Sequence, residues 1–314
     1  MEFSSQNWIF VPFLEFARDN KFKLFMKKYL FIIGLSIFSF AVQGQHFYLG
    51  ALVGGSNYLG DLSENSNRLI LKETKLAGGL FAGYQINDFA EVKFGFNYAQ
   101  VAGADANAKD KAVQARNLSY YSNIYEFSLR GEWNIIGFQP YNYSRPLSPF
   151  IFAGINGFKF DPKTDFEGQK IPLQPVGTEG QGMPDRPQAY KLFDFAVPFG
   201  LGVKYALTEN WTLGIECGAR FTFTDYLDDV SGTYVAYEDL LAGNGALAAA
   251  LGNREGELTG APPVSVATGT QRGDNNSKDW YFIAGLTITY NFIDSGMLGS
   301  RKKIRRRRTG CPTD

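Results

Sequence analysis

The sequence predicts an all-β fold, an eight-stranded antiparallel β-barrel that spans an outer membrane. Three observations predict it: segments of ten or so residues that alternate apolar and polar side chains, a secretory signal ahead of them, and aromatic side chains near their ends. Phe, Tyr and Trp make up 16% of the 314 residues. A disordered chain is poor in aromatics, and a coiled coil draws about half its residues from A/E/K/L/R, so both classes are excluded.

A signal peptide precedes the alternating segments. Residues 26–28 are a short basic start, residues 29–42 are a 14-residue apolar run, and we expect cleavage between Gly44 and Gln45. The run is too short for a stable membrane span. The alternative is an amino-terminal anchor helix. We expect four parts: 1–25 as an extension from a start codon assigned too early, 26–44 as the signal peptide, 45–292 as the barrel, and 293–314 as a periplasmic basic tail.

The mature chain alternates with period two. In one segment the apolar Val92, Phe94 and Phe96 alternate with Glu91 and Lys93. This period marks strands that have one apolar face. No stretch of eighteen apolar residues remains after the signal peptide, so no helical span is expected. We expect eight strands, an even number as in bacterial barrels, near residues 46–58, 76–87, 90–101, 117–135, 150–160, 190–206, 211–225 and 279–292.

A soluble sandwich or barrel would show the same alternation with its apolar face inward. The aromatic side chains near strand ends and the signal peptide favour the membrane barrel. Pro198 lacks a ladder donor, so we expect a bulge there or a later strand start. Tight turns near 87–89 and 207–210 and the connection 136–149 alternate with longer connections, which places both mature termini in the periplasm of a bacterial outer membrane. The longer connections are near 59–75, 102–116, 161–189 and 226–278.

The polar face of the strands carries four acids and four bases. An eight-stranded barrel has an interior about wide enough for side chains alone, and unpaired charges there would be costly. We therefore expect internal ion pairs that plug the lumen, with a proton or ion path as the functional alternative. The eight residues are Glu91, Lys93, Glu126, Arg130, Glu132, Lys204, Glu216 and Arg220.

The composition argues against catalysis. His46 is the one histidine, which nearly excludes zinc hydrolases and Ser-His-Asp enzymes. Cys217 and Cys311 are too few for a disulfide scaffold or an iron–sulfur site, and Cys217 is expected to face lipid. We expect no enzymatic activity, no cofactor, no metal and no small-molecule substrate.

The last long loop is acidic, with nine Asp or Glu and three Lys or Arg from Asp225 to Asp279. Asp225, Asp228 and Asp229 lack a defined Ca²⁺-ligand spacing, so a solvated loop is predicted. Residues 246–251 are expected to form a short helix. The 161–189 loop is rich in Gly, Pro and Gln and is predicted to be irregular.

Seven cations lie within eight residues of the tail. Outer-membrane lipid is an expected partner, and the tail could be held to anionic phospholipid by charge alone. The sharper hypothesis is docking on an acidic protein face, because five of the seven are arginines suited to bidentate carboxylate contacts. Nucleic acid is not expected for a periplasmic tail. The docking residues are Arg301, Lys302, Lys303, Arg305, Arg306, Arg307 and Arg308.

Ordered features along the chain resemble a known family. They are a signal peptide ending Gln-Gly-Gln, a first strand that begins at 47–50 and ends in Tyr-Leu-Gly-Asp-Leu at 58–62, and the basic tail followed by Cys-Pro-Thr at 311–313. Together they resemble the PorG-like outer-membrane barrels of Bacteroidota. The resemblance implies a structural component of the type IX secretion and gliding machinery that contacts the periplasmic ring of PorK and PorN.

Two other classes stay open. One is a small OmpA/OmpX-like barrel acting as an adhesin or diffusion channel, which has no need for a basic periplasmic tail. The other is an outer-membrane enzyme such as an acyltransferase or protease barrel. It is the weakest, because such sites need an activated nucleophile or base.

Overall fold

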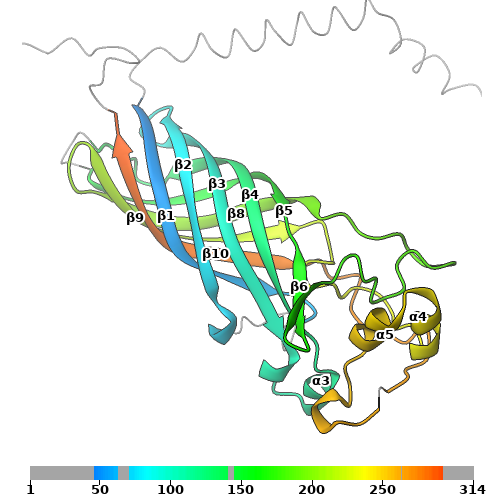
Figure 1. The fold of residues 1–314 in the computed structure, drawn as a ribbon. Helices are drawn as coiled ribbons and strands as arrows, with labels where there is room; N and C mark the ends of the chain where they lie inside the picture. Colours follow the sequence, from blue (N-terminus) through cyan, green and yellow to red (C-terminus); the bar gives the residue numbers. More distant parts are fainter. Residues whose placement is uncertain (1–45, 63–70, 141–144, 263, 293–314) are drawn as a thin grey trace, which may run out of the picture. The chain divides into compact units, whose positions relative to one another are not determined.

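The computed structural model describes residues 46–62, 71–140, 145–262 and 264–292 of the chain. Eight strands of these ranges form one barrel (Figure 1). Each lies within a few residues of a predicted strand, so the predicted fold class is confirmed. The strands are β1 (His46–Leu59), β2 (Lys75–Gln85), β3 (Ala90–Ala104), β4 (Ser119–Asn134), β5 (Leu147–Lys159), β8 (Phe193–Ala206), β9 (Trp211–Thr222) and β10 (Trp280–Asn291).

The sheet closes on itself. Its neighbours run β3-β2-β1-β10-β9-β8-β5-β4, every pair is antiparallel, and β3 also pairs with β4. The first and last strands are joined along their whole length, from Tyr48 opposite Asn291 to Leu59 opposite Trp280. Closure leaves no barrel strand with an unpaired edge, which is the condition for a sheet inside a bilayer.

The outer face of the barrel is apolar. Val53 and Leu80 are each 66% exposed, and Ile155, Leu201 and Leu286 are exposed to a similar degree. Trp and Tyr side chains stand near both ends of this band, with Trp211 packed on Tyr290 near one end and Tyr98 on Tyr125 near the other. An apolar exterior with aromatic girdles around a polar interior is the construction of an outer-membrane barrel. Cys217 lies on this exterior, as predicted.

The connections divide the barrel into two ends. We call the end with the connections 86–89, 135–146 and 207–210 the turn end; β1 begins there and β10 ends there. The opposite end is the loop end, where the connections 60–74, 105–118, 160–192 and 223–279 lie (Figure 1).

The loop end carries small elements of its own. The helix predicted at 246–251 is confirmed as α5. The 161–189 loop is not irregular throughout, because β6 pairs with β4 and then with β7. The elements are η1 (Leu71–Glu73), η2 (Asp105–Asn107), α3 (Lys111–Arg116), β6 (Pro162–Phe166), β7 (Gln169–Pro172), α4 (Tyr237–Gly243), α5 (Ala246–Gly252) and η3 (Glu257–Thr259). No helix of the described ranges is long and apolar enough to cross a membrane.

Of the two expectations at Pro198, the later strand start is met, since β8 begins at Phe193 and not at residue 190, but the bulge is wrong. Strand β8 begins five residues before it, and Pro198 pairs with Arg220 of β9 without a bulge. On the other side, the pairing with β5 skips Gly154 and Ile155 and resumes in the same register. The strand accommodates a residue that lacks an N–H by losing ladder contacts on one side only.

Both ends of the chain lie outside the described residues. These ends include the cleavage site between Gly44 and Gln45, the seven tail cations of 301–308, and Cys311.

Candidate functional site

The lumen near the turn end holds a network of charged side chains. Lys93 Nζ lies 2.6 Å from Glu132 Oε1, and Arg130 Nη2 lies 2.7 Å from Glu216 Oε2. Lys204 Nζ lies 2.6 Å from an oxygen of Glu91. Longer contacts of 3.3–3.7 Å link these three pairs into one network. Its members are Glu91, Lys93, Arg130, Glu132, Lys204 and Glu216.

Neutral side chains complete the surroundings of these charges. The Tyr48 hydroxyl donates to Glu91 Oε2 at 2.8 Å, and Asn134 Nδ2 donates to Glu91 Oε1 at 2.8 Å. Lys93 Nζ lies 4.4 Å from the centre of the Phe81 ring. A buried charge is tolerable only when such partners replace the water that it has lost.

A second ion pair lies nearer the loop end. Arg220 Nε lies 3.2 Å from Glu126 Oε2, and Arg220 Nη1 donates to the Gly218 carbonyl at 2.8 Å. Tyr281 and Asn97 donate to the two oxygens of Glu126 at 2.7 and 2.8 Å. The structure thus brings all eight interior residues named from the sequence into buried ion pairs.

These side chains leave little free space in the lumen. A cavity of about 30 Å³ near the turn end is lined by members of the network and by Tyr48, Gln85 and Phe138. Such a volume holds one or two water molecules. All eight charged side chains are at most 8% exposed, so they pack the described interior, as expected for eight strands.

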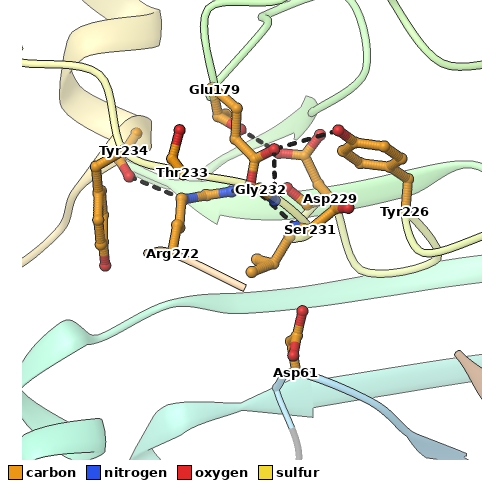
Figure 2. Close-up of polar contacts among 12 residues, drawn as sticks. Asp61, Glu179, Tyr226, Asp229, Ser231, Gly232, Thr233, Tyr234 and Arg272 are labelled. Atoms are coloured by element: carbon orange, nitrogen blue, oxygen red, sulfur yellow. Dashed lines mark hydrogen bonds and ion pairs between the residues drawn. The ribbon is translucent and has the colours of Figure 1, made fainter. Parts of the chain in front are cut away.

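We call the described parts of the four loop-end connections the loop cap. Its centre is Glu179, which lies in a loop and accepts hydrogen bonds from several donors (Figure 2). The backbone N–H groups of Ser231 and Gly232 donate to its Oε1 at 3.0 and 3.1 Å. Arg272 Nη1 lies 3.0 Å from the same oxygen, and the Tyr226 hydroxyl donates to Oε2 at 3.4 Å. Glu179 thus ties the 160–192 connection to the 223–279 connection.

Two further contacts fix the cap. Asp229 accepts from the Thr178 hydroxyl at 2.6 Å and from the Tyr190 hydroxyl at 2.7 Å. Arg116, the last residue of α3, binds both oxygens of Asp105 at 2.7 and 2.8 Å. Arg116 also donates to the carbonyls of Asp61 and Arg272 at 3.0 and 3.1 Å, so hydrogen bonds join the described parts of all four connections.

The prediction of a solvated loop at Asp225, Asp228 and Asp229 was wrong. All three are at most 3% exposed. Burial raises the pKa of Asp225 to about 7 and that of Asp229 to about 6. Burial, together with the charge of Asp61, raises the pKa of Asp228 well above its usual value. The acidic composition of the segment led to the wrong prediction of solvent exposure. In the fold, backbone N–H groups and hydroxyls replace water as partners of these carboxyls.

The cap offers no metal centre but has a surface groove. Within the described ranges, no group of three or more His, Cys, Asp or Glu side chains is arranged to hold a metal ion. The groove has a volume of about 720 Å³ and lies between the 183–186 turn, α4 and the 233–235 segment. Asp185 on its rim has a φ of 60°, which is unusual outside glycine.

Sequence reasoning missed the cap because its contacts are long-range. Glu179 and Arg272 are 93 residues apart, and neither stands in a recognisable spacing with its partners. The one available signal was the Tyr-Leu-Gly-Asp-Leu segment at 58–62. Its Tyr58 hydroxyl contacts Asp228, and the Leu62 N–H donates to Asp228 at 3.2 Å.

Comparison with known proteins gives a family. The family model described as a domain of unknown function (DUF6089) matches residues 26–248. No curated protein matches the chain. Three solved structures illustrate the structural similarity, and the chain spans the full length of each and is covered over 80% of its own.

The first is the amino-terminal β-barrel domain of Pseudomonas aeruginosa OprF, with 13% identity and a TM-score of 0.34. The second is Neisserial surface protein A, with 11% identity and a TM-score of 0.38. The third is a major outer-membrane protein of Thermus thermophilus, with 15% identity and a TM-score of 0.38.

Proposed function

The chain belongs to the DUF6089 family, whose description names no function, and we propose that it is a structural outer-membrane component of the type IX protein secretion and gliding machinery. In this proposal the loop cap faces the outside of the cell and both mature termini lie in the periplasm. The basic tail then contacts the PorK/PorN ring. The protein has no catalytic role.

One observation carries the structural role. The lumen is filled by ion-paired side chains, and its turn-end cavity of about 30 Å³ holds only one or two waters. A diffusion channel needs a continuous wet passage, whereas an anchor needs a rigid wall. The packed interior favours the anchor.

The choice of machine rests on the resemblance to PorG-like barrels. The segment 58–62, its most specific part within the barrel, contributes to the loop cap, where Tyr58 and Leu62 contact Asp228. The other specific part is the tail at 301–308, with five arginines and two lysines. Clustered arginines suit bidentate contacts with carboxylates on a partner.

Truncation of the tail tests the proposal. A chain ending at Ser300 should still insert as a barrel, which its faster migration on a gel without heating would show. It should lose co-purification of PorK and PorN, and secretion of cargo should fail. A matched variant with all five tail arginines changed to lysine keeps the charge and should retain weaker, more salt-sensitive binding. Normal secretion by the truncated protein would contradict the proposal.

A second candidate function is adhesion. The groove of about 720 Å³ in the loop cap favours it, because the groove opens at the end that would face the outside. Adhesion requires the loops and not the tail. Loss of surface attachment on exchange of the 183–186 turn, with secretion intact, would support adhesion.

A further inference from the structure

The loop cap meets the barrel wall at a tyrosine held between two carboxyl groups. The Tyr58 hydroxyl of β1 lies 2.6 Å from Asp228 Oδ2 and 3.0 Å from Asp279 Oδ1. None of the three residues is more than 1% exposed. The contact joins β1 to both ends of the 223–279 connection, so it is a point at which the cap is fastened to the barrel.

The Tyr58 hydroxyl does not have enough hydrogens to donate to two ionised carboxylates. A tyrosine hydroxyl carries one hydrogen and can donate it to one acceptor. If Tyr58 donates to Asp228, the contact with Asp279 requires that Asp279 donates in turn. One carboxyl group therefore carries a proton.

The other donors at the site indicate which one it is. Asp228 already accepts from backbone N–H groups at both oxygens, from Leu62 at Oδ2 (3.2 Å) and from Val230 at Oδ1 (2.9 Å). In Asp279, Oδ2 accepts from the Leu227 N–H at 2.9 Å, while the hydrogen bond of Oδ1 is with the Tyr58 hydroxyl and its other close neighbour is the Gly60 backbone. Asp279 Oδ1 is therefore the position at which a proton can be donated to the Tyr58 oxygen.

The surrounding charges favour the protonated form. No ion pair of the described residues includes Asp228 or Asp279; Arg116, which acts on Asp228, is bound to Asp105, and Lys278, next to Asp279 in the chain, donates to the Asn275 carbonyl. The other titratable groups that face the pair are Asp61, Asp225, Tyr120 and Tyr190. Burial, together with the charges of Asp228 and Asp225, raises the pKa of Asp279 well above its usual value.

We propose that Asp279, Tyr58 and Asp228 form a proton-held latch that keeps the loop cap on the barrel. Asp279 donates its proton to Tyr58, and Tyr58 donates to Asp228. When the proton passes to solvent base, two buried carboxylates share a single hydrogen, and the 223–279 connection loosens from β1. Because the folded pKa is raised, the latch is fully closed at low pH and is lost as the pH rises through that value. The latch does not depend on the proposed role in secretion.

Proteolysis of the full-length protein in detergent micelles at pH 6 and pH 9 tests the latch. Asp279→Asn places an amide donor at the position of the proton, so its cap should lose less protection between the two pH values than the wild-type cap, with the Asp225 contribution common to both proteins. Cleavage of the wild-type cap, measured relative to that variant, should rise from pH 6 to pH 9, because the latch loses its proton as the pH rises through the raised pKa of Asp279. Comparing the two proteins at one pH cancels the pH dependence of the protease.

Two matched variants sharpen the result. Asp228→Asn turns an amide nitrogen toward the Leu62 or Val230 N–H, so its cap should be cleaved readily at both pH values. Asp165→Asn changes an exposed carboxylate at the loop end and should behave as the wild type. Equal cleavage of wild type and Asp279→Asn at pH 9 would overturn the latch.

An infrared measurement keeps the proposal testable if the variants fold poorly. At pH 6 the wild-type protein should show carbonyl bands of more protonated, exchange-resistant carboxyl groups than the one that Asp225 contributes in its own right. Asp165→Asn should retain the bands, and raising the pH should remove them. A wild-type protein without such additional bands would also overturn the latch.

Discussion

In the lumen, four carboxylates meet four cations, and each carboxylate lies within 3.2 Å of a Lys or Arg nitrogen. In the loop cap, the described residues include seven buried carboxyl groups but one buried arginine, Arg272, with Arg116 partly buried. The cap carboxyls are Glu73, Asp105, Glu179, Asp225, Asp228, Asp229 and Asp279. Most of them rely on backbone N–H groups, hydroxyls and protons instead of cations.

This difference has a consequence for pH. Each lumen carboxylate is held by a cation, so we expect the barrel wall to stay intact when carboxyl groups of the cap lose their protons. Asp225 and Asp229 of the cap, with pKa values of about 7 and about 6, lose protons near neutrality, so the cap should loosen while the barrel stays intact. The predictions below compare the lumen with the loop cap.

The largest effect is expected from breaking a lumen pair. Arg220→Met leaves Glu126 charged, buried and without its cation, which should lower the free energy of unfolding by roughly 3–5 kcal/mol. Urea titration of the protein in micelles, followed by the gel shift between folded and unfolded forms, measures it. The double variant Glu126→Leu with Arg220→Met should recover most of the loss; no recovery would mean that the pair is not coupled.

A smaller and local effect is expected at the centre of the cap. Glu179→Gln keeps an acceptor for the Ser231 and Gly232 N–H groups but removes the charge that Arg272 faces at 3.0 Å. The loss should be roughly 2 kcal/mol, the range for hydrogen bonds to charged groups. Hydrogen exchange should rise in the cap and stay unchanged in the strands. Equal loss of protection in both regions would contradict the separation of cap and barrel.

A pH effect is expected at Asp225. Its pKa of about 7 is raised from 3.8, so its contribution is complete below about pH 4 and is lost as the pH rises through 7. Asp225→Asn should therefore flatten the fall in cap protection between pH 6 and 8. Hydrogen exchange of the cap, referred to that of the strands at each pH, measures the change. An unchanged slope would show that Asp225 does not titrate there.

The smallest effect is expected at the surface of the loop end. Lys163 lies 2.7 Å from Asp161, and both side chains are about a third exposed. Lys163→Met should change the free energy of unfolding by less than about 1 kcal/mol, since solvent screens such pairs. The same urea titration used for Arg220→Met checks it. If Lys163→Met lowered the free energy of unfolding as much as Arg220→Met, burial would not explain the difference between surface and lumen ion pairs.

The barrel could be predicted from the sequence because the alternation of side chains along a strand is a local pattern. The period-two alternation places Glu126, Arg130 and Glu132 on the face opposite Phe127 and Leu129. In a small closed barrel the polar face lines the lumen. The bulge predicted at Pro198 was wrong because a strand that is paired on both sides can give up contacts on one of them.

The cap was not accessible because its partners are distant in sequence. Tyr58 and Asp279 are 221 residues apart, and no local period connects them. The acidic composition of the 226–278 loop predicted solvent exposure. Asp229 of this loop is instead buried, with hydrogen bonds from Thr178 and Tyr190. The Ser231 N–H of the loop donates to Glu179, and only the fold brings these partners near.

The most direct test of the account is ion conductance, because its central claim is that this barrel is a packed anchor and not a pore. The purified full-length protein, shown to be folded by its gel shift, is reconstituted in a planar bilayer beside a porin that reports successful insertion. A lumen filled by the Lys93–Glu132, Arg130–Glu216 and Arg220–Glu126 pairs predicts no steady current. A steady conductance that scales with salt concentration would contradict the account.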